Sequence, residues 1–183
     1  MGRLARCKAP TLAIESCARF LTVWQSGGRT ARLVIVGDGP ERVSCLSLTE
    51  SLGIADRVEF IGQLARSDVE AYYAAADVFL FPSFTEATGN VYLEALRAGL
   101  PLVVTANGGG GGIPSNAAAV KIPVMAYPDM VEAYAQAILE LAADPERRRA
   151  MGIATFKCVR DNYAWPVISR KLLEVMKQAS RRS

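Results

Sequence analysis

The sequence contains no histidine, and its cysteines form no pair at the spacing of a metal or redox motif. Without an imidazole, the Ser/His/Asp and Cys/His systems that activate a nucleophile are excluded. A zinc site would have to be assembled from scattered thiolates. We therefore expect no metal centre and interpret the four cysteines as reduced thiols of a cytosolic protein; they are Cys7, Cys17, Cys45 and Cys158.

Long apolar runs are also missing. No stretch approaches the ~20 residues that a membrane span requires, and the charges of Arg3, Arg6 and Lys8 interrupt any signal-peptide core near the amino terminus. We therefore expect a cytoplasmic protein. The net charge is only +3, and no basic run is interleaved with aromatic residues, so a nucleic-acid partner is not expected.

Short apolar runs, in contrast, recur along the chain. Its 183 residues, 51% of them hydrophobic, are enough for one globular domain with a sizeable core. Four runs rich in Val, Ile, Leu and Phe have few polar interruptions, as strands buried on both faces should. These runs span 32–37, 57–62, 77–82 and 101–106, and 119–123 is a weaker fifth.

Helical patterns lie between these runs. Helix starts are indicated at Pro10, at Pro40 with Gly53 as its end, at Ser67 with Glu70 as a capping box, and at Asp144-Pro145, before a last helix over 167–178. Strands that alternate with helices predict an α/β fold with a doubly wound parallel sheet. A ligand is then expected at the carboxyl ends of the strands.

Two of the loops at those strand ends are candidate binding sites. In the turn Gly37-Asp38-Gly39-Pro40, glycine can bring the backbone close to a ligand while Asp38 caps the next helix, although a purely structural turn explains the pattern equally well. The second loop ends where a helix begins near Gly89 and Asn90. Free amides and the positive dipole end of such a helix form an anion site.

Glu86 and Glu94 lie on either side of this helix start. Carboxylates accept hydrogen bonds from vicinal hydroxyls, as on a ribose or a sugar ring. Two of them beside an anion site would suit a ligand made of sugar, diphosphate and ribose in series. The alternative, which the spacing alone leaves open, is that Glu86 is a loop charge and Glu94 a helix surface residue.

The stretch EATGNVYLEALRAGLPLVVT, residues 86–105, resembles the E-x7-E signature of the retaining glycosyltransferases of the GT-B class, group 1 family. Further segments resemble other motifs of that family in the same order: GRLARCK at 2–8, LVIVGDGPE at 33–41, VEFIGQL at 58–64 and DVFLFPS at 77–83. The resemblance implies that residues 1–183 form the C-terminal, donor-binding, Rossmann-like domain of such an enzyme. The first strand would be truncated, and the terminal helices would span about 145–180.

The resemblance also implies roles for individual residues. Glu86 would contact the donor sugar as the catalytic carboxylate, and Glu94 would bind the ribose. The other donor-binding candidates are Arg3 and Lys8 for the diphosphate, the amides of Gly89, Asn90 and Val91 for its phosphates, and Gly37 of the 37–39 turn. The base would lie near residues 60–64, where plain core packing is an equal alternative, and a basic tail is the alternative for the two cations.

The implied function is transfer of a sugar, with retention, from a UDP- or GDP-linked donor. The donor is a substrate, so no cofactor is expected, and the absence of a DxD motif agrees with metal independence. Because the resemblance covers only the donor-binding half, we expect the acceptor half to be missing, this chain alone to be inactive, and any peripheral membrane association to come from that other half. Alternatives are a non-catalytic nucleotide or nucleotide-sugar binding module and an epimerase-like enzyme.

The segment after residue 106 departs from the family pattern. Five consecutive glycines occupy 108–112, and Ser115 and Asn116 stand where the family has an acid. We expect a flexible loop here, with a phosphate-binding nest of amides as the alternative.

Overall fold

The computed structural model describes residues 1–24, 28–86 and 89–180 of this chain. Each of the five predicted strands is confirmed, and every strand pairing is parallel. The strands are β1 (Leu33–Val36), β2 (Val58–Gly62), β3 (Phe79–Phe81), β4 (Leu102–Thr105) and β5 (Ala119–Ile122). Their boundaries lie within two residues of the apolar runs, because β-branched and aromatic side chains pack well on a buried pleated surface.

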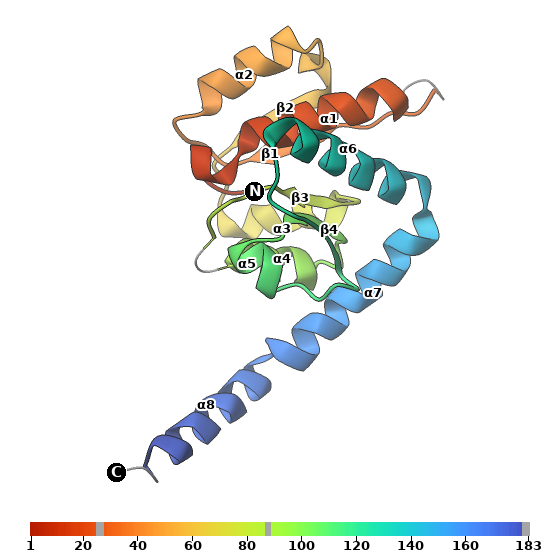
Figure 1. Ribbon diagram of the computed structural model, residues 1–183. Helices are drawn as coiled ribbons and strands as arrows, with labels where there is room; N and C mark the ends of the chain where they lie inside the picture. The colour runs from red at the N-terminus through yellow and green to blue at the C-terminus, as the bar shows by residue number, and fades with distance from the viewer. Residues whose placement is uncertain (25–27, 87–88, 181–183) are drawn as a thin grey trace.

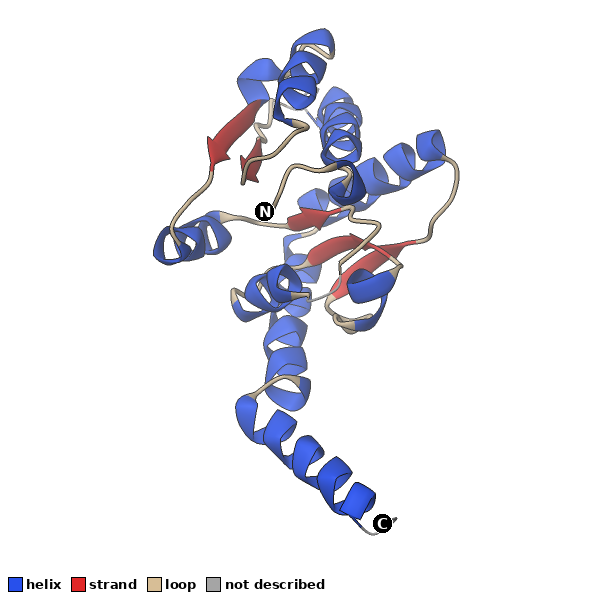
Figure 2. Cartoon of the chain, turned by 90° about the vertical axis from the view of Figure 1, so that its left-hand side faces the viewer, coloured by secondary structure: helices blue, strands red, loops and turns tan. Residues whose placement is uncertain are grey.

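The strands form two sheets rather than one continuous sheet. One sheet has the order β1-β2 and the other β3-β4-β5. The amino-terminal segment connects them: the Gly2 amide donates to the Val36 carbonyl and the Phe84 amide to the Cys7 carbonyl, each at 2.9 Å. Figure 2 shows the amino terminus between the two groups of strands. Residues 2–8 therefore join the end of β1 to the loop after β3.

Helices cover both faces of the strands (Figure 1). They are α1 (Pro10–Trp24), α2 (Arg42–Ser51), α3 (Arg66–Ala75), α4 (Asn90–Arg97), α5 (Gly108–Gly112), α6 (Tyr127–Ala143), α7 (Pro145–Asn162) and α8 (Trp165–Ser180), with short 3₁₀ turns at Arg6–Lys8 and Ala55–Arg57. Helices α1 and α6 pack against each other, and both contribute to the cores that lie on β1-β2 and on β4-β5. Helices α3 and α4 pack with β3 and β4 in a separate core.

The sequence did not lead us to predict α6, although its signals were present. Pro128 lies in its first turn, and Met130, Tyr134, Ala137 and Leu141 repeat at helical spacing and are buried. Helices α7 and α8 were predicted, and Asp144 caps α7 by accepting from the Arg147 amide at 2.8 Å. Helix α8 extends away from the strands (Figure 1) and leaves large apolar side chains such as Trp165 exposed.

Two predicted helix caps were wrong. Helix α3 begins at Arg66, so Ser67 lies inside it and the residue before it, Ala65, makes no side-chain cap. Asp38 does not cap α2, which begins at Arg42; its Oδ1 accepts from the Gly39 amide at 2.7 Å and closes the turn instead. In both places the helix boundary is displaced from the residue with capping chemistry, so that side chain cannot reach the free amides.

The glycine run is not the flexible loop that we expected, since residues 108–112 form α5. A Cβ on Gly110 would lie 2.4 Å from the Thr105 carbonyl oxygen, so only glycine allows this approach to β4. Lys121 Nζ donates to the Gly111 carbonyl at 2.8 Å and satisfies a group at the helix end. Tertiary contacts thus hold a segment whose intrinsic helix propensity is poor.

No helix among the described residues combines the length and the apolar character needed to cross a membrane.

Candidate functional site

An open cleft of about 870 Å³ lies at the carboxyl end of β1, and we call it the main cleft. Its walls come from four segments: residues 1–3, residues 36–39, Gln63 and Leu64 after β2, and side chains of α3 and α4. This is the strand end at which a ligand is expected in an α/β fold. Four of the predicted donor-binding residues line it, namely Arg3, Gly37, Val91 and Glu94.

The predicted base segment is divided by the structure. Gln63 and Leu64 line the main cleft, whereas Phe60 packs in the core around β1 and β2. The Arg42 guanidinium lies 5.7 Å from the centre of the Phe60 ring. Core packing therefore accounts for the start of this segment, and its end lines the main cleft.

Gly37 brings the turn close to the amino-terminal segment. Its φ of +127° belongs to the region that favours glycine, and a Cβ would lie 1.9 Å from the carbonyl oxygen of Gly2. A Cβ on Gly39 would likewise lie 2.4 Å from the carbonyl oxygen of Leu4. These glycines are needed for backbone packing whether or not a ligand is bound, and this packing shapes one wall of the main cleft.

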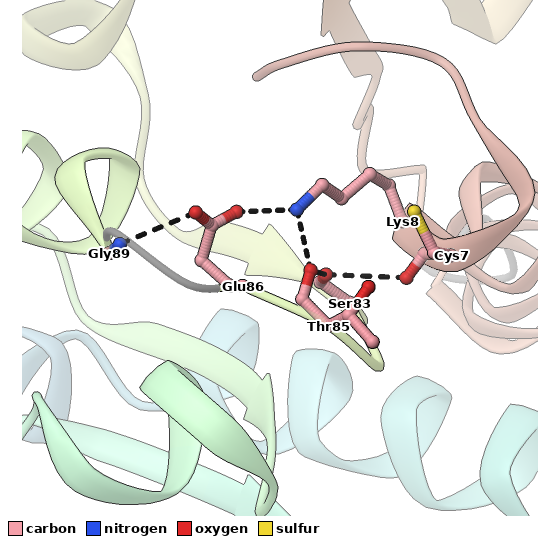
Figure 3. A network of polar contacts seen from close by, with 6 residues as sticks. All are labelled: Cys7, Lys8, Ser83, Thr85, Glu86 and Gly89. Carbon is pink, nitrogen blue, oxygen red and sulfur yellow. Dashed lines mark hydrogen bonds and ion pairs between the residues drawn. The ribbon is translucent and has the colours of Figure 1, made fainter.

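Glu86 is held between Lys8 and the start of α4 (Figure 3). Lys8 Nζ lies 2.6 Å from Glu86 Oε2 and donates to the Thr85 carbonyl at 2.6 Å. The amide of Gly89, the residue before α4, donates to Glu86 Oε1 at 3.3 Å. Lys8 and Glu86 were each predicted to contact the ligand, and in the structure their opposite charges neutralise each other. Residues 87 and 88, inside the signature, lie outside the described residues.

Backbone contacts fix the position of this ion pair. The Ser83 hydroxyl lies 3.3 Å from the Cys7 carbonyl oxygen and 2.9 Å from the Thr85 carbonyl oxygen, and it can donate its hydrogen to either (Figure 3). We did not predict a role for Ser83, which had appeared only as the last residue of a strand motif. Lys8 and Glu86 are not among the described residues that line the main cleft.

Glu94, in contrast, faces the main cleft from α4 with 31% of its side chain exposed. Its Oε2 accepts a hydrogen bond from the Tyr73 hydroxyl at 3.1 Å, and its Oε1 lies 4.0 Å from Arg66 Nη2. Burial, and then the nearby Glu94 carboxylate, raise the pKa of Tyr73 far above its ordinary value. The phenol therefore stays protonated and acts as a donor to Glu94.

Residues at the start of α4 line two different pockets. Gly89 has φ of +68°, in the left-handed region that favours glycine, and a Cβ there would lie 2.0 Å from Ile113 Cδ1, so the end of that side chain would have to shift. Val91 lines the main cleft, but Asn90 lines a smaller pocket of about 220 Å³, together with Arg66 and Glu94. Of the three residues whose amides were predicted to contact phosphate, Val91 therefore lines the main cleft and Asn90 lines the smaller pocket, and Glu94 lines both.

The arrangement provides a cation, a carboxylate and the positive end of a helix around one cleft. Arg3 and the start of α4 can attract an anionic group, and the carboxylate of Glu94 can accept hydrogen bonds from hydroxyls. No group of three or more Cys, Asp or Glu side chains within the described part of the chain is arranged to hold a metal ion.

Comparison with curated proteins identifies similar glycosyltransferases. The chain is 34% identical over 154 residues to a protein of Mycobacterium tuberculosis named GDP-mannose-dependent alpha-(1-6)-phosphatidylinositol monomannoside mannosyltransferase. The match covers 80% of this chain and 39% of that relative. The chain therefore spans well under half the length of the curated relative.

Solved structures share the fold. Sucrose-phosphate synthase from Thermosynechococcus elongatus matches 100% of this chain and 45% of its own, with a TM-score of 0.79 and 25% identity. Anabaena HepE, solved in complex with UDP and glucose, matches 97% of this chain and 47% of its own, with a TM-score of 0.77 and 20% identity. The predicted α/β, Rossmann-like fold of a GT-B C-terminal half is confirmed by these matches.

The match at the level of the family covers more of the sequence than the signature that first indicated it. The model for the family "Glycosyl transferases group 1" matches residues 1–157, from the amino-terminal segment to within α7. The motifs that resembled this family, from GRLARCK to the E-x7-E stretch, all lie inside that range. The chain therefore belongs to the group 1 glycosyl transferases.

Proposed function

We propose that this chain is the donor-binding domain of a retaining glycosyltransferase that uses a UDP- or GDP-linked sugar. The observation that carries the proposal is the placement of Glu94 and Arg3 in one cleft with the start of α4. The names of two similar proteins support it, since one is GDP-mannose-dependent and another was solved with UDP and glucose. Retention, the nucleotide and the sugar are part of the proposal.

The main cleft has a suitable size for the nucleotide part of a donor. Its volume of about 870 Å³ falls within the range of small-molecule sites. In the proposed complex the base lies against Gln63 and Leu64, and the ribose hydroxyls donate to Glu94. The diphosphate lies near Arg3 and the amides of α4, so that the sugar extends toward Glu86 and Lys8.

This arrangement can stabilise the leaving group without a metal ion. As the bond to the sugar breaks, negative charge develops on the diphosphate, and fixed cations and helix amides aimed at that charge lower the barrier. Arg3 and Lys8 would supply the cations, and the first amides of α4 would supply the dipole. Glu86, the anionic member of the ion pair with Lys8, would then contact the reacting sugar.

We assign acceptor binding to a part of the enzyme outside the region that this chain matches. The similar mannosyltransferase is more than twice as long as the matched region. We propose that a second domain binds the acceptor, provides any contact with a membrane, and works with this domain in the cytoplasm.

A non-catalytic nucleotide-binding module is the second candidate. One observation favours it: Glu86, the proposed sugar contact, is paired with Lys8 and is not among the residues that line the main cleft. A module of this kind would bind a nucleoside diphosphate equally well with or without an attached sugar.

Calorimetric titration tests the proposal. UDP, GDP, UDP-glucose and GDP-mannose should each be titrated in magnesium-free buffer, and one nucleotide should bind in both its free and its sugar-linked form. Glu94→Gln should weaken both forms by about 10- to 100-fold, because a hydrogen bond to a charged group contributes ~1.5–3 kcal/mol. Glu70→Gln is the matched control, since Glu70 is an exposed carboxylate 3.8 Å from Arg97.

Glu86→Gln distinguishes the two candidates. A donor-binding domain predicts that this change penalises the sugar-linked ligand relative to the free nucleoside diphosphate. A nucleotide module predicts that the ratio of the two affinities stays constant. Failure of every nucleotide to bind, with folding verified by circular dichroism, would contradict both.

A further inference from the structure

Tyr73 is an anchored side chain next to the main cleft. It comes from α3 and is only 3% exposed. Its ring lies 5.7 Å, centre to centre, from the ring of Phe79 on β3, in the core that α3 shares with α4. A tyrosine buried in this way needs a partner for its hydroxyl, because an unpaired buried polar group is unfavourable.

The partner is the carboxylate that faces the cleft. The Tyr73 hydroxyl donates to Glu94 Oε2 at 3.1 Å, and its next acceptor, the Val91 carbonyl, is at 3.5 Å. Glu94 has a flexible side chain, and its other neighbour, Arg66, is 90% exposed and 4.0 Å from Oε1. The rigid contact on Glu94 is therefore the one from Tyr73 to Oε2, while Oε1 lies beside the exposed side chain of Arg66.

We infer that Tyr73 is a positioning residue for nucleotide binding, which holds the Glu94 carboxylate in the orientation that accepts the ribose hydroxyls. This inference rests on the proposed function. Tyr73 need not touch the nucleotide; it acts by limiting the rotamers of Glu94 before the ligand arrives. A side chain that is already ordered loses less conformational entropy on binding, so the ribose contact becomes stronger.

Tyr73→Phe tests the inference because it removes only the hydroxyl and keeps the buried ring. The ligands are the nucleoside diphosphate that binds the wild type and its 2′,3′-dideoxy counterpart. Wild type should prefer the hydroxylated ligand, and Tyr73→Phe should reduce that preference by about two- to tenfold, the range expected when one more side chain must be ordered on binding. Affinity for the dideoxy ligand should stay unchanged.

Tyr72→Phe is the matched control. Tyr72 is the neighbouring residue on α3 and half-buried, and its hydroxyl makes no hydrogen bond among the residues that the structure describes. This variant should keep the wild-type preference. In a Glu94→Gln background, Tyr73→Phe should cause no further loss, because the carboxylate that it orients is gone.

Equal weakening of both ligands in Tyr73→Phe would show a merely structural role and would overturn the inference, as would an unchanged preference for the ribose hydroxyls. If Tyr73→Phe does not fold, Glu94→Asp replaces it: this change retracts the carboxylate from Tyr73 but keeps the charge, and it must reduce the same preference. If wild type binds nucleotide but Glu94→Gln leaves its affinity unchanged, the ribose assignment itself fails and the inference fails with it.

Discussion

Replacing Glu86 with glutamine should strengthen the binding of a nucleoside diphosphate. In the free protein, Lys8 Nζ is 2.6 Å from Glu86 Oε2, so a diphosphate that needs Lys8 must compete with this carboxylate. Glutamine has almost the same shape, and its amide oxygen can still accept from the Gly89 amide as Glu86 Oε1 does. The Thr85 carbonyl still accepts from Lys8, which stays in place but loses its anionic partner.

The expected gain follows from the exposure of the pair. The side chains of Lys8 and Glu86 are 22% and 13% exposed, so the pair is neither fully buried nor a surface contact. Exposed ion pairs contribute ~0–1 kcal/mol, and hydrogen bonds between charged groups ~1.5–3 kcal/mol. We expect an intermediate value of about 1 kcal/mol, which corresponds to about a fivefold lower Kd.

Isothermal titration calorimetry at low ionic strength measures this change. Lys8→Met should weaken diphosphate binding, and Glu86→Gln in the Lys8→Met background should give no gain. Glu132→Gln is the control for a general change in net charge, because it removes one carboxylate from an exposed ion pair with Arg19. If a folded Glu86→Gln protein binds the diphosphate as tightly as wild type or more weakly, Glu86 does not compete with the diphosphate for Lys8. If Glu86→Gln gives the same gain in affinity in the wild-type and Lys8→Met backgrounds, the gain does not come from Lys8.

Two further predictions concern stability. Gly37→Ala should destabilise the fold by more than ~2 kcal/mol in urea denaturation, because its Cβ would meet backbone atoms of Gly2 in addition to the cost of a positive φ. Gly53→Ala, with φ of +66° and open space around it, should lose only ~1–2 kcal/mol of stability. Equal losses of stability in the two variants would mean that the fold does not need the close approach of Gly37 to Gly2. Burial raises the pKa of the thiols of Cys17 and Cys45 to about 12 and about 11, above the ~8.5 of an unfolded chain. The contribution of these neutral thiols to the free energy of unfolding is complete below about pH 8.5 and falls as the pH rises toward their pKa values in the folded protein. The free energy of unfolding measured from about pH 8 to 9.5 should therefore decline, and it should decline less steeply in Cys17→Ala. A pH-independent stability over this range would contradict the burial of both thiols.

The strands and most helices could be predicted because their signals are local. Continuous runs such as 101–106 require burial on both faces, and β4 in that run is fully buried. Pro10 and Pro145 begin helices as expected, since a fixed φ and a missing amide suit the first turn. The prediction of a flexible loop over the glycine run was wrong because the signal there is not local. The helical form of this run depends on contacts with Thr105 and Lys121, which local helix propensity does not include.

The sequence by itself determined the family and the chemistry available to the site. The spacing of Glu86 and Glu94 around a helix start predicted a phosphate- and hydroxyl-binding surface at a strand end, with a loop charge and a helix surface residue as the alternative. Arg3 was added by the resemblance to the family. These residues are recognisable because their motif depends on short separations along the chain, which the turn and helix geometry preserve.

Only the tertiary structure decided which of these groups meet. Lys8 and Glu86 are separated by 78 residues, and they pair because the amino-terminal segment lies against the loop after β3. Tyr73 meets Glu94 because α3 and α4 pack side by side on β3 and β4. The partner of a side chain depends on which segments, far apart in the sequence, the fold brings together. Residue spacing along the sequence does not contain that information.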